Sequence, residues 1–159
     1  CGLMITPDGP KVVEYNCRLG DPEAQVVLPL VETDLVDVFD ALADGTLETG
    51  SLRTAPGAAA CVVLASGGYP IEYETGYEIS GLDQAERLSE VSVIHAGTSR
   101  RDDGALVTDG GRVLSVTARG ADLREALNRA YEGVDLINFK GKTVRSDIGE
   151  KGLAHLSGA

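Results

Sequence analysis

The run from Val12 to Gln25 most constrains the fold, because it changes from strand-like to turn-like sequence within a few residues. It opens with two β-branched valines, which favour extended backbone. Gly20-Asp21-Pro22 then interrupts the strand. A proline with fixed φ suits the first turn of a helix, and an aspartate before it suits the N-cap. The run therefore predicts a strand that ends in a turn, followed by a short helix that begins at Pro22 with Asp21 as its cap.

Glu14, Asn16 and Arg18 occupy alternate positions of this predicted strand. Alternate side chains of a strand share a face, so the three are expected to lie side by side. Carboxylate and amide oxygens are hard ligands that suit Mg²⁺ or Mn²⁺ better than zinc, and the arginine fork fits phosphate or carboxylate. The spacing predicts a metal–phosphate site near the end of the strand. The alternative is a solvated polar face with no ligand.

The composition is typical of a soluble globular protein, because 43% of the 159 residues are hydrophobic and 25% are charged. The formal charge of −11 argues against nonspecific nucleic-acid binding, and no apolar run approaches the ~20 residues that span a bilayer. Three widely separated cysteines give neither a zinc spacing nor a disulfide framework, which favours a reducing, cytoplasmic compartment. Lipid attachment at Cys1 is an alternative, but the residues that follow it already resemble a strand. Since the chain lacks an initiator methionine and begins inside this predicted strand, we expect a piece of a longer polypeptide.

The first third of the chain is expected to form a β-hairpin and two helices. The hairpin covers residues 2–17, with Pro7-Asp8-Gly9 supplying the fixed φ and the permissive glycine of its turn. The clearer helix is predicted over residues 33–44 and is followed by Gly45 as a stop. Its apolar stripe consists of Leu35, Val38, Phe39 and Leu42.

An aperiodic linker is predicted at residues 47–56, and it divides the chain into a first domain of residues 1–53 and a second of residues 54–159. The first domain holds ten acidic and three basic residues, a net charge of −7, and the second holds fifteen acidic and eleven basic residues, a net charge of −4. The second domain is expected to be α+β, with an antiparallel or curled mixed sheet and one main helix. Its strands are predicted at residues 58–65, 77–80, 91–96, 105–108, 112–119 and 136–139.

Turn and cap residues place the rest of the second domain. Asp109-Gly110-Gly111 is typical of a hairpin turn and is expected to join the strands on either side of it. The main helix is predicted to start at Asp122, with Glu125 three residues later in capping-box spacing, and to end at Gly133.

Several other polar residues are candidates for chemistry. His95 lies where a predicted strand ends in a small-residue loop, so it has either a structural or a catalytic role. Near the C-terminus, Lys140, Lys142 and Arg145 form a basic segment. That segment is either a site for an anion such as a sugar phosphate or a solvated end of the chain.

Taken together, the motifs resemble those of the phosphoribosylamine–glycine ligase family, also called glycinamide ribonucleotide synthetases. The resemblance begins with the run from Val13 to Gln25, given above, and its matches cover nearly the whole chain in order. The later matches are Ala65-Ser66-Gly67-Gly68-Tyr69-Pro70, His95-Ala96-Gly97-Thr98, Thr108-Asp109-Gly110-Gly111-Arg112-Val113-Leu114-Ser115-Val116-Thr117 and Arg145-Ser146-Asp147-Ile148-Gly149.

The resemblance implies an ATP-grasp enzyme that joins glycine to 5-phosphoribosylamine through a glycyl phosphate, with ATP as substrate, in purine biosynthesis. It implies that Glu14 and Asn16 are ligands of Mg²⁺ or Mn²⁺ and that Arg18 is the electrostatic partner of the transferred phosphoryl or acyl-phosphate group. Gly20, Asp21 and Glu23 would shape the substrate loop, and a sugar phosphate could contact Lys142 and Arg145.

Intact members of the family also carry an N-terminal domain and an earlier part of the ATP-grasp domain, which supplies a glycine-rich loop over ATP. Residues 1–53 would then be the C-terminal part of the ATP-grasp domain, and residues 54–159 the C-terminal domain. The expected partners are glycine, phosphoribosylamine, ATP and the rest of the ligase, with no nucleic acid and no membrane. The alternative is a non-catalytic module that keeps the fold and binds a small phosphorylated ligand or a subunit.

Overall fold

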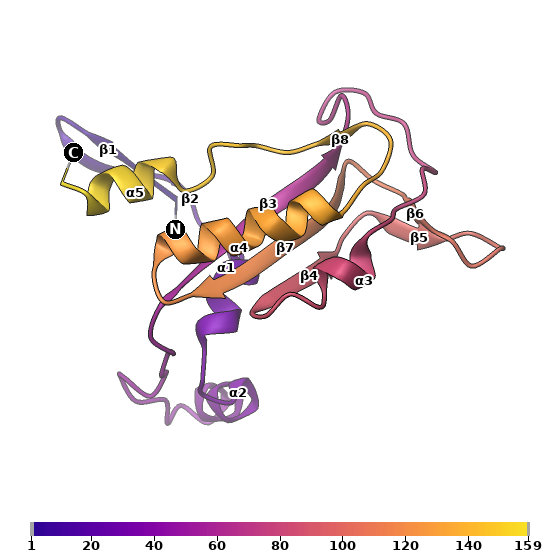
Figure 1. Cartoon of the computed structure of the whole chain (residues 1–159). Helices are drawn as coiled ribbons and strands as arrows, with labels where there is room; N and C mark the ends of the chain where they lie inside the picture. Colours follow the sequence, from indigo (N-terminus) through magenta and orange to yellow (C-terminus); the bar gives the residue numbers. More distant parts are fainter. Residues whose placement is uncertain (1, 159) are drawn as a thin grey trace.

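The protein has a mixed α+β fold, and the structure, a computed structural model, describes residues 2–158 (Figure 1). The elements follow one another in this order: β1 (Gly2–Thr6), β2 (Gly9–Glu14), α1 (Ala24–Val27), η1 (Leu28–Leu30, a 3₁₀ helix), α2 (Leu35–Ala43), β3 (Ala58–Ser66), α3 (Leu82–Ala85), β4 (Val91–His95), β5 (Thr98–Arg100), β6 (Leu106–Thr108), β7 (Arg112–Gly120), α4 (Leu123–Leu136), β8 (Lys142–Thr143) and α5 (Glu150–Leu156).

The central feature is a four-stranded antiparallel sheet with strand order β4-β7-β3-β8. Strands β3 and β7 are nine residues each and pair from Ala58 opposite Gly120 to Ala65 opposite Arg112. Their sequences are rich in β-branched and small apolar residues, which suits a strand with buried faces. The predicted antiparallel sheet and main helix are thus confirmed.

Helix α4 covers one face of this sheet and forms the core with it (Figure 1). Its buried stripe of alanine, leucine and valine contacts the inward-facing side chains of β3 and β7. Gly133 allows the close approach, because a Cβ there would lie 2.9 Å from Cγ1 of Val116. The predicted stop at Gly133 is therefore wrong, and the helix continues to Leu136. Its N-terminus is as predicted, since Asp122 accepts from the backbone N–H of Glu125 at 2.8 Å.

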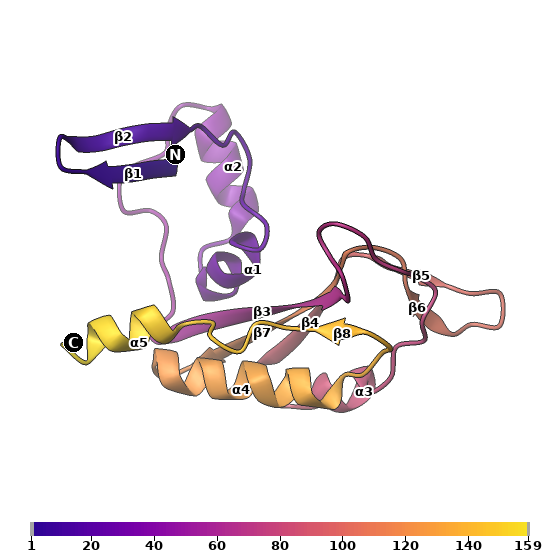
Figure 2. The ribbon, with the colours of Figure 1, turned by 90° about the horizontal axis from the view of Figure 1, so that it is seen from above.

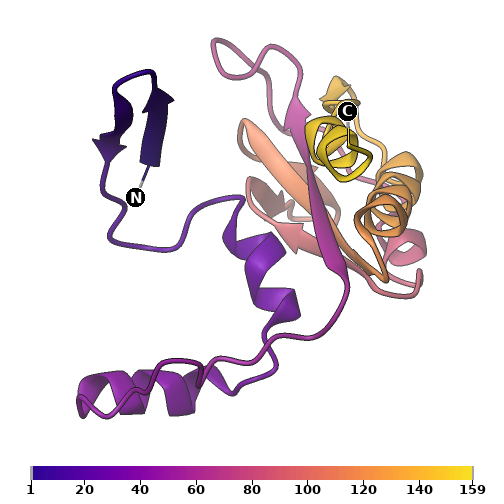
Figure 3. The ribbon, with the colours of Figure 1, turned by 90° about the vertical axis from the view of Figure 1, so that its left-hand side faces the viewer.

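Residues 2–43, which we call the first region, lie on the other side of the sheet (Figure 2). Helix α1 and η1 contact β3 on the face opposite α4, while the β1–β2 hairpin stands apart from the central sheet. Helix α2 projects away from both (Figure 3). The predicted hairpin and the predicted helix over residues 33–44 are both present, the helix as residues 35–43 with Asp34 as its N-cap.

Two predictions about the run from Val12 to Gln25 are wrong in detail. Strand β2 ends at Glu14, so Asn16 and Arg18 lie in the irregular segment after it and not on the strand. The short helix begins at Ala24, with Glu23 at the N-cap position and no side-chain cap. Asp21 does not cap it, because the side chain of Asp21 bonds to Gln25 and Arg112 instead.

In residues 58–139, which we call the second region, some strands and strand pairings predicted from local sequence are wrong. Asp109-Gly110-Gly111 is not a hairpin turn, because β6 pairs with β5 and β7 pairs with β3 and β4. Residues 77–80 make two isolated bridges, and residues 136–139 contribute a single bridge, so neither segment is a strand. Within residues 2–158, no helix has the length and apolar character that crossing a membrane requires.

Candidate metal–phosphate site

A pocket of about 520 Å³ lies where the hairpin passes into α1. It gathers the six residues of this run that were predicted to bind metal, phosphate or substrate, namely Glu14, Asn16, Arg18, Gly20, Asp21 and Glu23. The lining residues are Gly2, Glu14, Asn16, Arg18, Leu19, Gly20, Asp21 and Glu23. The predicted site residues therefore meet on one concave surface, although only Glu14 is on the strand.

Glu14 and Asn16 touch one another at the wall of this pocket, which we call the hairpin pocket. Nδ2 of Asn16 donates to Oε1 of Glu14 at 3.2 Å, and both side chains are exposed. Glu14 can present its carboxylate oxygens to a cation, and Asn16 can do so once its amide turns its oxygen inward. Mg²⁺ commonly takes one or two protein carboxylates and completes its shell with substrate phosphates and water. The donor set fits such an ion.

No group of three or more histidine, cysteine, aspartate or glutamate side chains is placed to hold a metal within residues 2–158. The ligands predicted for a metal in the hairpin pocket are two, Glu14 and Asn16, and Asp21 and Glu23 line the same pocket. That number suits an ion shared with phosphate oxygens better than a closed structural site.

Arg18 lines the same pocket from the segment after the strand. Nη1 of Arg18 donates to the backbone carbonyl of Leu19 at 3.1 Å, and the side chain is exposed. A guanidinium has five N–H donors, so this bond leaves others able to reach an anion in the pocket. The pocket thus combines oxygen donors for a cation with an arginine for an anion.

The loop Leu19–Glu23 closes the pocket on the α1 side. The Glu23 side chain folds back over Gly20, and a Cβ on Gly20 would lie 2.3 Å from its Oε2. The backbone N–H of Ala24 donates to the carbonyl of Gly20 at 2.9 Å. The predicted roles of Gly20 and Glu23 in shaping this loop are consistent with their positions and remain predictions.

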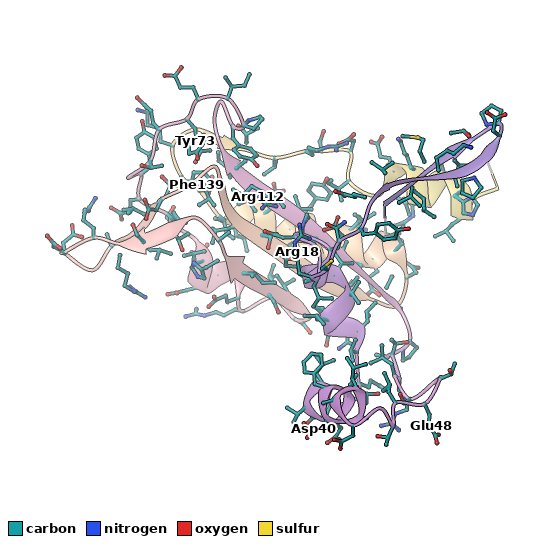
Figure 4. The ribbon with its side chains drawn as sticks, turned by 180° about the vertical axis from the view of Figure 1, so that it is seen from behind. Arg18, Asp40, Glu48, Tyr73, Arg112 and Phe139 are labelled. Atoms are coloured by element: carbon teal, nitrogen blue, oxygen red, sulfur yellow. The ribbon has the colours of Figure 1, made fainter. Side chains whose placement is uncertain are left out.

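Asp21 connects this loop to the central sheet. Nη2 of Arg112 contacts Oδ2 of Asp21 at 2.8 Å, and Nη1 donates to the carbonyl of Asp21 at 3.0 Å. The other carboxylate oxygen accepts from Nε2 of Gln25 at 2.8 Å. Figure 4 labels Arg112 and Arg18 near the centre of the view, where the two segments meet. In the sequence Arg112 belongs to a family motif with no assigned role, because no local pattern signals a partner 91 positions away.

A second pocket, of about 340 Å³, lies beside the first and is mainly apolar, with two arginines at its wall. We call it the sheet pocket. Its lining residues are Pro22, Val63, Ala65, Tyr69, Arg112, Thr143, Val144 and Arg145. Pro22 follows Asp21 directly, so the wall between the two pockets is the Asp21–Pro22 segment.

The two basic residues predicted for a sugar phosphate have different surroundings. Arg145 lines the sheet pocket and pairs with Asp147, its Nη2 lying 2.6 Å from Oδ2. The hydrogen bond and charge of Arg145 hold the pKa of Asp147 below its ordinary value. Nζ of Lys142 instead donates to the carbonyls of Val134 and Ile137 at 3.1 and 2.7 Å, at the C-terminal end of α4. Such end carbonyls lack helical partners, so Lys142 has a structural use in this position.

His95 and Lys140 lie outside both pockets. Nδ1 of His95 is 3.0 Å from Oγ1 of Thr98, just past the end of β4. Nζ of Lys140 donates to the hydroxyl of Tyr77 at 3.0 Å and lies over the ring of that tyrosine. This hydrogen bond raises the pKa of Lys140. Neither residue is brought to the predicted site residues.

The chain is similar to known proteins of one family. The family described as "Phosphoribosylglycinamide synthetase, C domain" matches residues 59–151. A phosphoribosylamine–glycine ligase of Chlorobaculum tepidum is 55% identical over 152 residues, which are 96% of this chain and 36% of that protein. The Rhodopirellula baltica ligase is 50% identical over 96% of this chain and 35% of its own length. A trifunctional purine biosynthetic protein adenosine-3 of Gallus gallus is 51% identical over 98% of this chain and 16% of its own length.

A solved structure is also similar. The crystal structure of the phosphoribosylamine–glycine ligase of Thermotoga maritima matches with a TM-score of 0.72 and 38% identity, over 92% of this chain and 35% of that chain. The chain thus spans about a third of the length of these bacterial ligases. Because the family match covers more than half of its residues, the chain belongs to the phosphoribosylglycinamide synthetase C-domain family.

Proposed function

We propose that this chain provides the C-terminal part of a phosphoribosylamine–glycine ligase, in which ATP drives the joining of glycine to 5-phosphoribosylamine during purine biosynthesis. The observation that carries the proposal is the hairpin pocket, which gathers Glu14, Asn16 and Arg18 in a chain that is 50–55% identical to two bacterial ligases over 96% of its length. The reaction would take place in the cytoplasm and pass through a glycyl phosphate. Residues 1–53 would complete an ATP-grasp domain, and residues 54–159 would form the C-terminal domain.

Glu14 and Asn16 would hold Mg²⁺ or Mn²⁺ at the pocket wall. The metal, when bound, would neutralise the nucleotide phosphates. The exposure of both side chains and their contact at 3.2 Å support this assignment, since a phosphate-bearing ligand needs an open approach to the ion.

Arg18 would stabilise the negative charge on the transferred phosphoryl or acyl-phosphate group. Phosphoryl and acyl-phosphate chemistry depends mainly on positioning and on charge stabilisation in the transition state. Gly20, Asp21 and Glu23 would fix the loop that faces the acceptor. These assignments rest on the common pocket that the residues line.

The sheet pocket is the better candidate for the sugar phosphate. Arg145 lines it together with Arg112, and Pro22 and Val63 provide apolar wall for the rest of a ligand. Lys142 would reach such a phosphate only by leaving the carbonyls at the end of α4. We therefore assign the contact first to Arg145.

The remaining two thirds of the length of the bacterial relatives would contribute the rest of the nucleotide site. We accordingly expect negligible ligase turnover and weak ATP affinity for the 159-residue chain alone. A purified chain with robust turnover would contradict this part of the proposal.

A chimera tests the proposed function directly. The matching third of the Chlorobaculum tepidum ligase is replaced by this chain, and glycine- and phosphoribosylamine-dependent ADP release is measured. We expect turnover close to that of the parent, and a loss of at least about 100-fold in Glu14→Gln, as for the loss of a group that stabilises transition-state charge. Glu48→Gln, in the exposed linker, is the matched control and should retain full turnover.

Two results would contradict the proposal. One is full turnover in the Glu14→Gln chimera. The other is a folded chimera, with an unchanged melting temperature, that releases no ADP. If that inactive chimera still binds a phosphorylated ligand, the alternative of a non-catalytic binding module is favoured.

A further inference from the structure

We propose that Arg112 is a positioning residue, which fixes the Leu19–Glu23 loop, and with it one wall of the hairpin pocket, against the central sheet. The inference rests on the proposed function only for its effect on turnover, because the contact itself is independent of any ligand. Arg112 touches no predicted metal ligand. It would act through Asp21.

The turn before Arg112 is packed so that it holds the start of β7 in one place. Ser66, buried at the end of β3, bonds it twice: its backbone N–H donates to the carbonyl of Gly111 and its Oγ to that of Gly110, both at 2.8 Å. A Cβ on Gly111 would lie 2.1 Å from the ring of Tyr69, and one on Gly97 would lie 2.7 Å from the Cα of Gly110. The glycines thus let three segments approach closely. These contacts hold the backbone just before Arg112 in place.

The guanidinium of Arg112 holds both the backbone and the side chain of Asp21. Nη1 donates to the carbonyl oxygen at 3.0 Å while Nη2 contacts Oδ2 at 2.8 Å. Two bonds from one planar group fix orientation as well as distance, which a single bond would not do. The Asp21 carboxylate also accepts from Gln25, so the first turn of α1 is tied to the same point.

Another polar contact lies at the far end of η1, where the backbone N–H of Ala55 donates to the carbonyl of Leu30 at 2.7 Å. Among residues 3–29, Asp21 alone is joined by a hydrogen bond or ion pair to residues 57–158. Helix α1 and η1 also pack against β3. Apolar packing is not directional, so it does not set the position of the polar loop by itself. Arg112 is therefore the polar contact that places the loop relative to the second region.

This placement matters for chemistry because Asp21 lines the hairpin pocket and Pro22 lines the sheet pocket. A shift of the loop would change the distance between a ligand held in one pocket and a ligand held in the other. Misplacement of reacting groups by about 1 Å can cost about 100-fold in rate. The chain therefore uses a contact from the C-terminal domain to align its two pockets.

Hydrogen–deuterium exchange on the 159-residue chain tests the contact without any activity. In Arg112→Gln we expect at least 10-fold faster exchange of the backbone amides of residues 20–27, with β7 amides unchanged, since exchange reports local opening. The melting temperature should stay within about 2 °C, because an exposed ion pair contributes little to global stability. The control is Arg119→Gln, on the same strand, of similar exposure and paired with Glu90 at 3.7 Å, and it should leave the loop unchanged.

Turnover of the chimera supplies the second readout. Arg112→Gln and Asp21→Asn should each lower kcat about 10- to 100-fold with the KM for glycine within about twofold, and the double variant should be no worse than either, because coupled residues are not additive. Arg112→Lys should recover part of kcat. Unchanged loop exchange, additive losses, or a uniform loss of stability would overturn the inference. If the wild-type chimera is inactive while the exchange result holds, only the proposed function fails.

Discussion

Residues 2–43 and residues 58–139 differ in how they bury apolar surface. Within residues 2–158, the buried apolar side chains all lie between Ala59 and Phe139. Most of the exposed large hydrophobic side chains instead precede residue 54, among them Ile5, which is 76% exposed, and Tyr15, which is 75% exposed. The second region builds its own core. The first region exposes apolar faces to solvent. Such faces are typical of a surface that packs against another part of a protein.

The largest contrast is expected from truncating one apolar side chain in each region. Leu64 is fully buried in β3, and Leu64→Ala should lower the free energy of unfolding by about 2–5 kcal/mol. Leu42, on the exposed stripe of α2, is the matched control, and Leu42→Ala should change it by less than about 0.5 kcal/mol. Urea unfolding measures both. Equal losses would show that the first region shares the core of the second.

Self-association tests the exposed faces themselves. At high protein concentration we expect the chain to associate and to bind a dye that reports apolar surface, because Leu3, Ile5 and Val13 are all exposed on the hairpin. The double variant Ile5→Ser/Val13→Ser should shift sedimentation toward the monomer. A monomeric wild-type chain with no dye binding would show that the hairpin has no accessible apolar face.

The N-caps of α4 and α2 are expected to contribute differently to stability. Asp122 caps α4, which is packed on the sheet, and Asp34 caps α2, which projects from it. Asp122→Ala should lower the free energy of unfolding by about 1 kcal/mol. Asp34→Ala should lower the helical circular dichroism signal but leave the main unfolding transition within about 0.3 kcal/mol, since α2 contributes no buried residue. Equal shifts would indicate that both helices unfold with the core.

The smallest effect is expected at the Arg145–Asp147 pair. The pKa of Asp147 lies below the ordinary 3.8 because Arg145 donates to it, so the stabilisation from this pair is present above 3.8 and is lost as pH falls through the lowered pKa. NMR titration of the Asp147 carboxyl should give a pKa below 3.8. Arg145→Gln should raise the pKa toward 3.8, and no change would exclude the pairing in solution.

Local patterns predicted most elements because they depend on neighbouring residues. The apolar run of residues 58–65 identifies a buried strand, and the cap at Asp122 and the stripe of α4 identify a helix and its buried face. The errors came from tertiary context. Gly133 looks like a helix stop, yet it is buried where α4 crosses Val116, and Asp109-Gly110-Gly111 looks like a hairpin turn, yet it connects strands of different sheets.

The candidate site divides in the same way. Glu14, Asn16, Arg18, Gly20, Asp21 and Glu23 are close in sequence, so a single turn brings them to one pocket and spacing alone could group them. The partner of Asp21 could not be found this way, because Arg112 reaches it only after β3 and β7 have paired. Nor could sequence separate Lys142, whose amine binds helix-end carbonyls, from Arg145, which lines the sheet pocket.

The Mg²⁺ dependence of the chimeric ligase tests whether the hairpin pocket holds the metal-binding part of a ligase site. At saturating ATP and glycine, Glu14→Gln should raise the Mg²⁺ concentration for half-maximal ADP release by at least about 10-fold, because one of the two oxygen ligands loses its charge. Glu48→Gln should leave it unchanged. A Glu14→Gln chimera with the parental Mg²⁺ dependence and turnover would show that Glu14 does not bind the metal.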